Sequence, residues 1–106
     1  MNAFDDVLTE REALEVRADV TLFALRLSSE MTSPDSKLAR RIWKEDLERD
    51  RLEFPLDRQS LEEREAALKW AMYVFNSIAL PTATTACALW AEDLEFIGQQ
   101  LQCEVA

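Results

Sequence analysis

The longest feature of the hydrophobic pattern is a run without formal charge from Trp70 to Ala91, in a chain whose 106 residues include 12 basic and 21 acidic ones. Such a run predicts burial. About 20 apolar residues could cross a bilayer, but Asn76, Ser77 and three threonines interrupt the run and no basic cluster flanks it. Because proline lacks the N–H that a helix interior needs, we expect two soluble helices that meet near Pro81.

The helix before Pro81 is predicted over residues 61–80. Ser60 and Glu63 have the spacing of a capping box, in which each side chain accepts a bond from a free backbone N–H. Its polar positions form one narrow stripe, so most of its circumference is apolar. We therefore expect it to be the central helix of the fold or part of a dimer interface. The stripe consists of Glu62, Glu65, Lys69, Tyr73 and Asn76.

The helix after Pro81 is predicted over residues 82–102, with a wider polar face. Asp93 falls on the flank of this helix, so its carboxylate is expected to be half-covered and to need a partner. Gly98, the one glycine of the chain, is expected to end the helix or to allow close packing. The residues expected to be buried are Ala83, Ala86, Trp90, Leu94, Ile97 and Leu101.

The first helix is predicted over residues 10–31, starting at a capping box of Thr9 and Glu12. Its core stripe is expected to consist of Val16, Val20, Phe23 and Leu27. The opposite side is predicted to face water through Glu12, Glu15, Asp19, Arg26 and Glu30, with Leu22 among them as a possible apolar contact.

The second helix is predicted over residues 34–52, with Ser33 as its cap and Pro34 at its first position. It has few apolar residues, and opposite charges recur at four-residue steps, as at Arg41 and Glu45. We expect it to form a solvated outer wall. A loop follows at residues 53–59, and we recognise no internal repeat.

Four helices with short connections predict an all-α fold, an antiparallel four-helix bundle of two helical hairpins in a single helical domain over residues 1–106. The alternative at Pro81 is one kinked helix exchanged between two subunits, which would make the protein an obligate dimer. For the bundle we expect a homodimer through residues 70–91, although a monomer with the uncharged helix at its centre would also satisfy the pattern.

Several classes of chemistry have no support in the residues present. The chain has no histidine, the commonest general base and transition-metal ligand. Cys87 and Cys103, 16 residues apart on one helix, would lie about 24 Å apart, which is too far for a disulfide. Two cysteines are also too few ligands for a structural zinc site. No role is assigned to Cys103. The acidic N-terminus does not resemble a secretory signal, so a reducing cytoplasm is expected. No cofactor is expected.

Paired carboxylates offer the one enzymatic alternative. The spacing Glu-x-x-Glu occurs four times, at Glu12/Glu15, Glu45/Glu48, Glu62/Glu65 and Glu92/Glu95. Such pairs on facing helices could hold magnesium in an all-helical nucleotide pyrophosphohydrolase. Since each pair is predicted to face outward, we expect no metal site and no enzyme.

The distribution of charge favours a protein partner. The net charge is −9, and the first and last helices account for most of it. These helices would be neighbours in the bundle, and their acidic face could steer a basic partner. The expected contact residues are Glu12, Glu15, Asp19, Leu22, Glu92 and Glu95.

A secondary basic patch is predicted at Lys37, Arg40, Arg41 and Lys44. We expect it to meet the protein's own acidic helices or an acidic partner, because the net charge opposes direct binding of nucleic acid. The functional hypothesis is a cytoplasmic, non-enzymatic inhibitor, adaptor or chaperone-like protein. The alternative is a nucleic-acid mimic that blocks a DNA- or RNA-binding protein.

Overall fold

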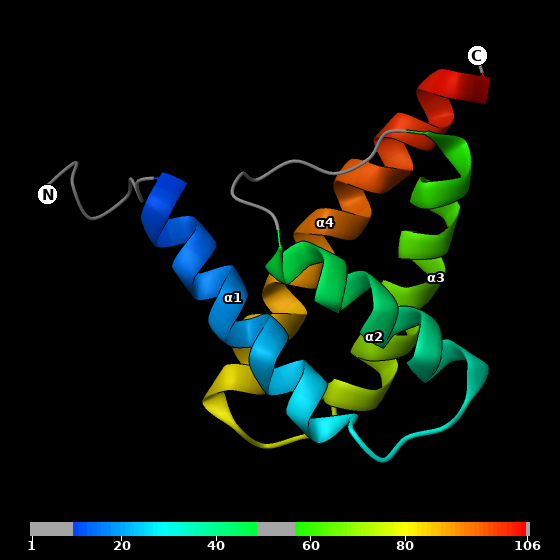
Figure 1. The fold of residues 1–106 in the computed structure, drawn as a ribbon. Helices are drawn as coiled ribbons and strands as arrows, with labels where there is room; N and C mark the ends of the chain where they lie inside the picture. Colours follow the sequence, from blue (N-terminus) through cyan, green and yellow to red (C-terminus); the bar gives the residue numbers. More distant parts are fainter. Residues whose placement is uncertain (1–9, 49–56, 106) are drawn as a thin grey trace, which may run out of the picture.

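The computed structural model describes residues 10–48 and 57–105, which form four α-helices. These are α1 (Glu10–Leu27), α2 (Pro34–Leu47), α3 (Arg58–Phe75) and α4 (Pro81–Val105). The all-α prediction is confirmed. The helices pack as the neighbouring pairs α1/α2, α2/α3, α3/α4 and α4/α1, so that the first and last helices are in contact. Figure 1 shows two helical hairpins, α1–α2 and α3–α4, with both turns at the same end of the molecule.

The helix starts follow local capping chemistry. Ser33 caps α2 by accepting a bond from the N–H of Ser36 at 3.2 Å, and Pro34 occupies the first turn as predicted. The cap of α3 is Asp57, whose carboxylate accepts the N–H of Ser60 at 3.0 Å. The predicted capping box of Ser60 and Glu63 is therefore wrong, because an acidic cap is available three residues earlier. Thr9 lies outside the described residues.

Three helix ends differ from the predictions. α1 ends at Leu27 and not at Met31; just beyond it, the Ser28 hydroxyl donates to the carbonyl of Ala24 at 2.7 Å, a local bond that competes with helix continuation. α2 ends at Leu47, with Glu48 as its C-cap, and residues 49–52 of the predicted helix lie outside the described residues. α3 ends at Phe75 and not at residue 80, and residues 76–80 form the connection to α4. In this structure α3 and α4 are thus two separate helices that pack against each other, and not one continuous kinked helix.

α4 is longer than predicted, since it runs from Pro81 to Val105 in place of residues 82–102. Gly98 lies inside it and does not end it. A Cβ atom built at Gly98 would meet nothing within 4 Å. Both roles expected for this glycine are therefore wrong.

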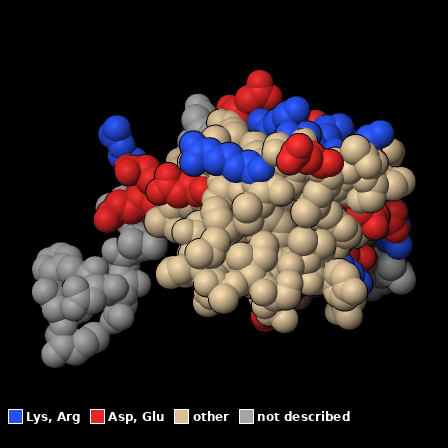
Figure 2. Space-filling model, turned by 90° about the horizontal axis from the view of Figure 1, so that it is seen from below, with Lys and Arg blue, Asp and Glu red and all other residues tan. Residues whose placement is uncertain are grey.

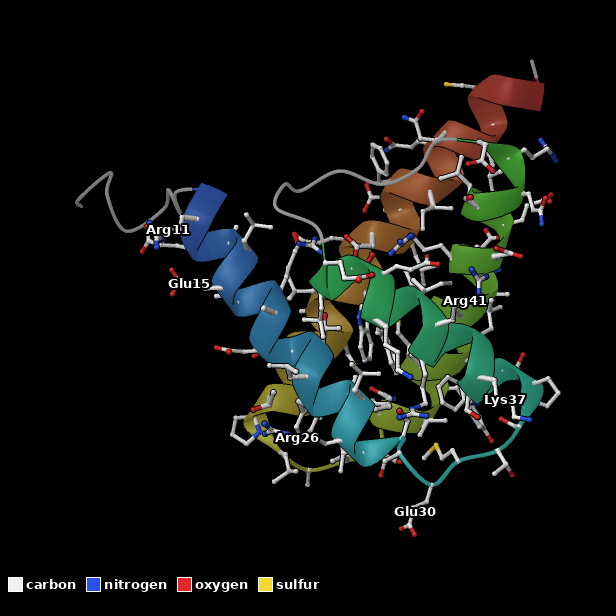
Figure 3. The ribbon with its side chains drawn as sticks, viewed as in Figure 1. Arg11, Glu15, Arg26, Glu30, Lys37 and Arg41 are labelled. Carbon is white, nitrogen blue, oxygen red and sulfur yellow. The ribbon has the colours of Figure 1, made fainter. Side chains whose placement is uncertain are left out.

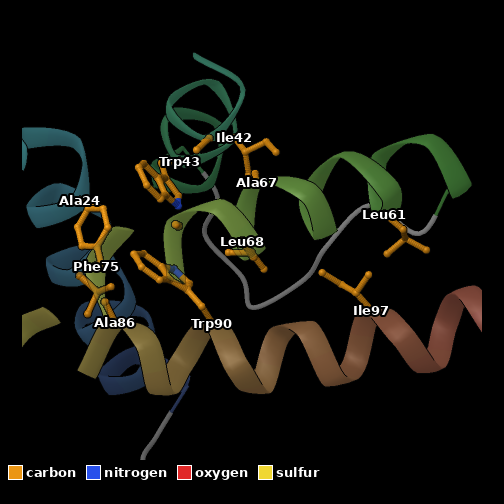
Figure 4. Close-up of a cluster of buried hydrophobic side chains, with 13 residues drawn as sticks. Ala24, Ile42, Trp43, Leu61, Ala67, Leu68, Phe75, Ala86, Trp90 and Ile97 are labelled. Carbon is orange, nitrogen blue, oxygen red and sulfur yellow. The ribbon is translucent and has the colours of Figure 1, made fainter. Parts of the chain in front are cut away.

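An aromatic cluster forms the centre of the core (Figure 4). The rings of Trp43 and Trp90 are stacked, with centroids 5.5 Å apart and an interplanar angle of 16°. Phe75 meets both edge-on, at 6.2 Å and 5.3 Å, and Phe23 meets Phe75 at 6.0 Å. All four helices thus contribute a ring, in geometries that aromatic pairs prefer.

Two parts of the burial prediction are wrong. Val20 is buried as expected, but Val16 and Leu27 are 36% and 40% exposed. The uncharged run from Trp70 to Ala91 is only partly buried. Its inward face includes Phe75 and Trp90, whereas its remaining positions form the α3–α4 turn and the outer side of α4.

The chain also contains an internal repeat, which we did not recognise in the sequence. Residues 10–48 align with residues 57–95 without a gap, at a displacement of 47, and 12 of 39 positions are identical. The first repeat comprises α1 and α2, and the second comprises α3 and the first part of α4. The identical pairs are Arg11/Arg58, Leu14/Leu61, Glu15/Glu62, Arg17/Arg64, Ala24/Ala71, Pro34/Pro81, Ala39/Ala86, Trp43/Trp90, Glu45/Glu92, Asp46/Asp93, Leu47/Leu94 and Glu48/Glu95.

Burial follows the same displacement. The buried residues of the first repeat are Val20, Thr21, Ala24, Ser28, Ser36, Ala39, Ile42 and Trp43, and each has a buried counterpart except Ile42, whose counterpart Leu89 is half-buried. The stacked Trp43 and Trp90 are themselves counterparts. The two hairpins therefore offer equivalent faces to a shared core, in an approximately two-fold arrangement.

None of the helices in the described ranges is long and apolar enough to cross a membrane.

Candidate functional site

Asp93 has the partner that its position on α4 predicted. It is 6% exposed and accepts two hydrogen bonds from Arg17 of α1, from Nη1 to Oδ2 at 3.0 Å and from Nη2 to Oδ1 at 2.8 Å. Bonding to Asp93 raises the pKa of Arg17, although partial burial of the guanidinium acts in the opposite direction. The carboxylates of Asp46 and Glu92 add to the increase in this pKa. Such a two-bonded pair is charge-assisted and has a fixed geometry.

A second ion pair with the same geometry joins the equivalent residues of the repeat. Arg64 of α3, which is 4% exposed, donates from Nη1 to Oδ2 of Asp46 at 2.9 Å and from Nη2 to Oδ1 at 2.8 Å. The two arginines are counterparts in the repeat, as are the two aspartates, so each arginine bonds to the aspartate of the other hairpin. The burial of Arg64 was not predicted from the sequence; the recurrence of an arginine and an aspartate at equivalent positions of the repeat is the signal that relates the two pairs. These four side chains hold the hairpins together.

The acidic surface is defined here as Glu12, Glu15, Asp19, Leu22, Glu92 and Glu95. All six residues are exposed, Leu22 by 40%. Glu15 lies 3.8 Å from Arg11, with both side chains largely in solvent. In residues 10–48 and 57–105, no ion pair involves Asp19, Glu92 or Glu95.

The structure places these residues in two stripes and not on one face. Arg17 points toward α4, and at 100° per residue Glu15 and Asp19 lie about 160° from it around α1. Figure 3 shows Glu15 directed away from the rest of the molecule. By the same geometry Glu95 lies on the outer side of α4, whereas Glu92 is close enough to Arg17 to affect its pKa.

Carboxylates on α2 and α3 are more often neutralised. Arg41 donates to Glu45 at 3.3 Å and to Glu63 at 2.9 Å, which joins α2 to α3. Arg58 lies 3.3 Å from Glu62, and Lys69 lies 3.9 Å from Glu65. The carboxylates without an ion pair in the described ranges therefore include Asp19 on α1 and Glu92 and Glu95 on α4.

The predicted basic patch is a contiguous feature of α2. Lys37, Arg40, Arg41 and Lys44, together with Glu45 and Glu48, line an open depression of about 400 Å³. Arg41 meets an acidic residue of the protein itself, but this is Glu63 of α3 and not a residue of α1 or α4. The counterparts of the four cations on α4 are Thr84, Cys87, Ala88 and Ala91, so the patch belongs to one repeat only.

No metal site is found in the described residues, where no three side chains of Asp, Glu or Cys come together. Two of the four Glu-x-x-Glu pairs, Glu45/Glu48 and Glu92/Glu95, are copies of each other in the repeat. Cys87 and Cys103 are both free thiols. Burial raises the pKa of the half-buried Cys87, whereas Cys103 is exposed.

The end of the molecule that contains both turns forms a further surface. Figure 2 views this end and shows a broad area with charged side chains mainly at its rim. We define the uncharged end by its exposed apolar residues Leu27, Met31, Tyr73 and Leu80, which are 40%, 37%, 84% and 47% exposed. Because α3 ends at Phe75, the uncharged residues 76–80 lie in the α3–α4 turn at this end of the molecule.

These features define a compact all-α protein of two repeated helical hairpins, which are joined by exchanged Arg–Asp pairs and carry separate acidic, basic and uncharged surfaces. Comparison with family models, with known proteins and with solved structures finds no match for this chain.

Proposed function

We propose that the protein is a small, non-enzymatic protein-binding module that presents its acidic surface to a partner with a basic surface. The main support is that Asp19, Glu92 and Glu95 are exposed and form no ion pair within the described part of the chain. Unneutralised carboxylates create a long-range field that speeds encounter with a basic surface. The net charge of −9 acts in the same direction.

In this proposal the chain is an antiparallel four-helix bundle in a single domain that acts in the cytoplasm as an inhibitor, adaptor or chaperone-like protein. It binds neither nucleic acid nor membrane directly, and it forms a homodimer. The exchanged Arg–Asp pairs support a rigid scaffold, because each fixes one hairpin against the other. A rigid scaffold lowers the entropy lost on binding.

Mimicry of nucleic acid is the second candidate, and the spacing of the carboxylates argues against it. Glu12, Glu15 and Asp19 follow one another at three- and four-residue steps, which correspond to about 5 Å along the helix. Duplex DNA has a charge about every 1.7 Å. The outward direction of the two stripes is better suited to separate contacts with a protein.

The test is capture of partners from the native host with the tagged protein, followed by mass spectrometry and affinity measurement. The variant Asp19→Asn/Glu92→Gln/Glu95→Gln removes three carboxylates that lack a described ion pair. Its control, Glu45→Gln/Glu62→Gln/Glu65→Gln, removes the same charge from paired positions. We expect the first variant to weaken binding at least about tenfold and the control to have a much smaller effect. Equal effects of the two variants would contradict the proposal.

Salt and competition identify the kind of partner. Binding through the acidic surface should weaken as salt rises, since screening shortens the range of the attraction. If duplex DNA competes with the protein for the captured partner, mimicry is favoured over a plain protein contact. A screen for magnesium-dependent nucleotide hydrolysis addresses the enzymatic alternative.

A further inference from the structure

The uncharged end exposes apolar side chains that the fold itself does not require. The repeat provides the comparison, because equivalent positions of the two hairpins have similar backbone surroundings. The counterpart of Tyr73 is Arg26, and the counterpart of Leu80 is Ser33. All four positions are exposed. The first hairpin therefore folds with polar residues where the second exposes a tyrosine and a leucine, so these apolar residues call for another explanation.

Charge limits what can cover this surface. Two copies of a chain with net charge −9 repel each other, and the repulsion is strongest where acidic side chains face each other. The uncharged end lets two copies meet without placing like charges at the centre of the contact (Figure 2). A partner with a basic surface, by contrast, gains nothing from this end and is attracted to the acidic positions on α1 and α4.

We propose that a second copy of this chain docks on the uncharged end, so that two molecules join end to end around a two-fold axis through Tyr73 and Leu80. This inference identifies the surface of the homodimer in the proposed function, and it does not depend on the partner. In such a dimer the same patch of both molecules meets itself.

The rim of the uncharged end fits this contact. Arg26 and Glu30 flank it on α1 and the following turn; both are exposed, and Glu30 points away from the molecule in Figure 3. Neither forms an ion pair within the described residues. A two-fold contact can set the cation of one molecule against the carboxylate of the other. A core depleted of charge inside a polar rim is the usual anatomy of a protein interface.

The dimer responds to salt in the opposite sense to the proposed partner complex. Raising the salt concentration screens the repulsion between two acidic molecules, because the Debye length falls from about 10 Å at 0.1 M to about 3 Å at 1 M. Self-association through an uncharged surface should therefore tighten with salt, whereas binding of a basic partner should weaken. Failure of one proposal can thus be told apart from failure of the other.

The experiment is sedimentation equilibrium of the full chain, whose mass is 12.2 kDa, at low and high salt. We expect a dimer that dissociates on dilution and tightens with salt. Tyr73→Arg and Leu80→Ser install the residues of the other repeat and should each weaken the dimer about tenfold or more. Val16→Arg is the control, since Val16 is 36% exposed on α1 but lies 11 residues before Leu27. Its dissociation constant should stay within about twofold of the unsubstituted protein.

Circular dichroism of each variant checks that the helices are retained. If either Tyr73→Arg or Leu80→Ser fails to fold, the other still tests the proposal. The proposal is overturned if the unsubstituted protein remains a monomer at about 100 μM in high salt. It is also overturned if a dimer forms but both end variants associate as strongly as the control.

Discussion

Arg17 of α1 and Asp93 of α4, 76 residues apart, form a two-bonded ion pair, and its geometry is repeated between Arg64 and Asp46. The paired residues are exchanged between the two repeats, so each hairpin supplies one arginine and one aspartate. The observed packing of the hairpins gives all four groups a charged partner. The two ion pairs thus help to fix how one hairpin packs against the other.

The two ion pairs should differ in the cost of breaking them. Replacing Asp93 with alanine removes the two-bonded partner of Arg17, and Asp46→Ala removes that of Arg64. Losing one partner of a buried pair costs about 3 kcal/mol of unfolding free energy. Because the Arg64 side chain is 5% exposed and that of Arg17 is 30% exposed, we expect Asp46→Ala to be the more damaging change. Chemical denaturation measures both.

The control for these changes is Glu45→Ala, whose pair with Arg41 is half exposed on both sides. Exposed pairs contribute about 0 to 1 kcal/mol, so this variant should be nearly as stable as the unsubstituted protein. A smaller loss for Asp46→Ala than for Asp93→Ala would show that the exposure of the arginine that loses its aspartate does not determine the cost.

The stacked tryptophans provide a second comparison. Trp43 and Trp90 are almost equally buried, at 2% and 4% exposed, but the indole Nε1 of Trp43 is buried without a hydrogen-bond partner among the described residues. An unsatisfied buried donor costs about 1 to 3 kcal/mol. Trp43→Phe removes that donor, which offsets part of the lost packing. We therefore expect Trp43→Phe to destabilise the protein less than Trp90→Phe in thermal unfolding; the reverse order would contradict this account.

The cap of α3 should make stability depend on pH. The bond from the Ser60 N–H lowers the pKa of Asp57, so the folded state favours the charged carboxylate. This stabilisation is present above the ordinary aspartate pKa and is lost as the pH falls through the lowered value. Asp57→Asn keeps an oxygen acceptor but cannot titrate. The difference in melting temperature between the unsubstituted protein and Asp57→Asn should shrink between pH 6 and pH 2; a constant difference would exclude this role.

Gly98 should be a site where stability can be raised. It lies inside α4 with helical geometry, and a side-chain Cβ would meet no atom within 4 Å. Glycine in a helix interior costs about 1 kcal/mol relative to alanine. Gly98→Ala is therefore expected to raise the unfolding free energy by up to about 1 kcal/mol in urea titration. Destabilisation would indicate that a neighbouring molecule approaches the backbone at this position.

The two thiols should react at different rates. Burial raises the pKa of Cys87 and limits access to it, whereas Cys103 is exposed near the end of α4. Since the thiolate is the reactive form, a disulfide reagent should label Cys103 first in the native protein. Cys103→Ser should leave one slow thiol, and Cys87→Ser should leave one fast thiol. Equal rates would mean that Cys87 becomes accessible in solution.

The success of the sequence predictions depended on the range of the interaction involved. The cap at Ser33 and the break between two helices near Pro81 were predicted because both depend on neighbouring residues. The ends of α1 and α3 were placed too late, because apolar periodicity continues beyond the last helical turn. The need of Asp93 for a partner followed from its position, but the identity of Arg17 did not.

For the acidic residues, too, the local feature was predicted from the sequence and the long-range feature was not. Their exposure follows from the helical period and is observed at all of Glu12, Glu15, Asp19, Glu92 and Glu95. Their division into two stripes could not be predicted, because it depends on which side of α1 packs against α4. The basic patch lies within one helix, so the local pattern was sufficient to identify it.

By itself the sequence determined that this chain is helical, where most of its helices begin and which carboxylates face water, because helix formation and side-chain direction follow from residues three or four positions apart. Only the tertiary structure decided that Arg17 and Arg64 exchange partners, that Trp43 stacks on Trp90 and that part of the uncharged run remains exposed. These features depend on how two distant hairpins pack, and that packing is fixed by the combined fit of the core and the buried charges.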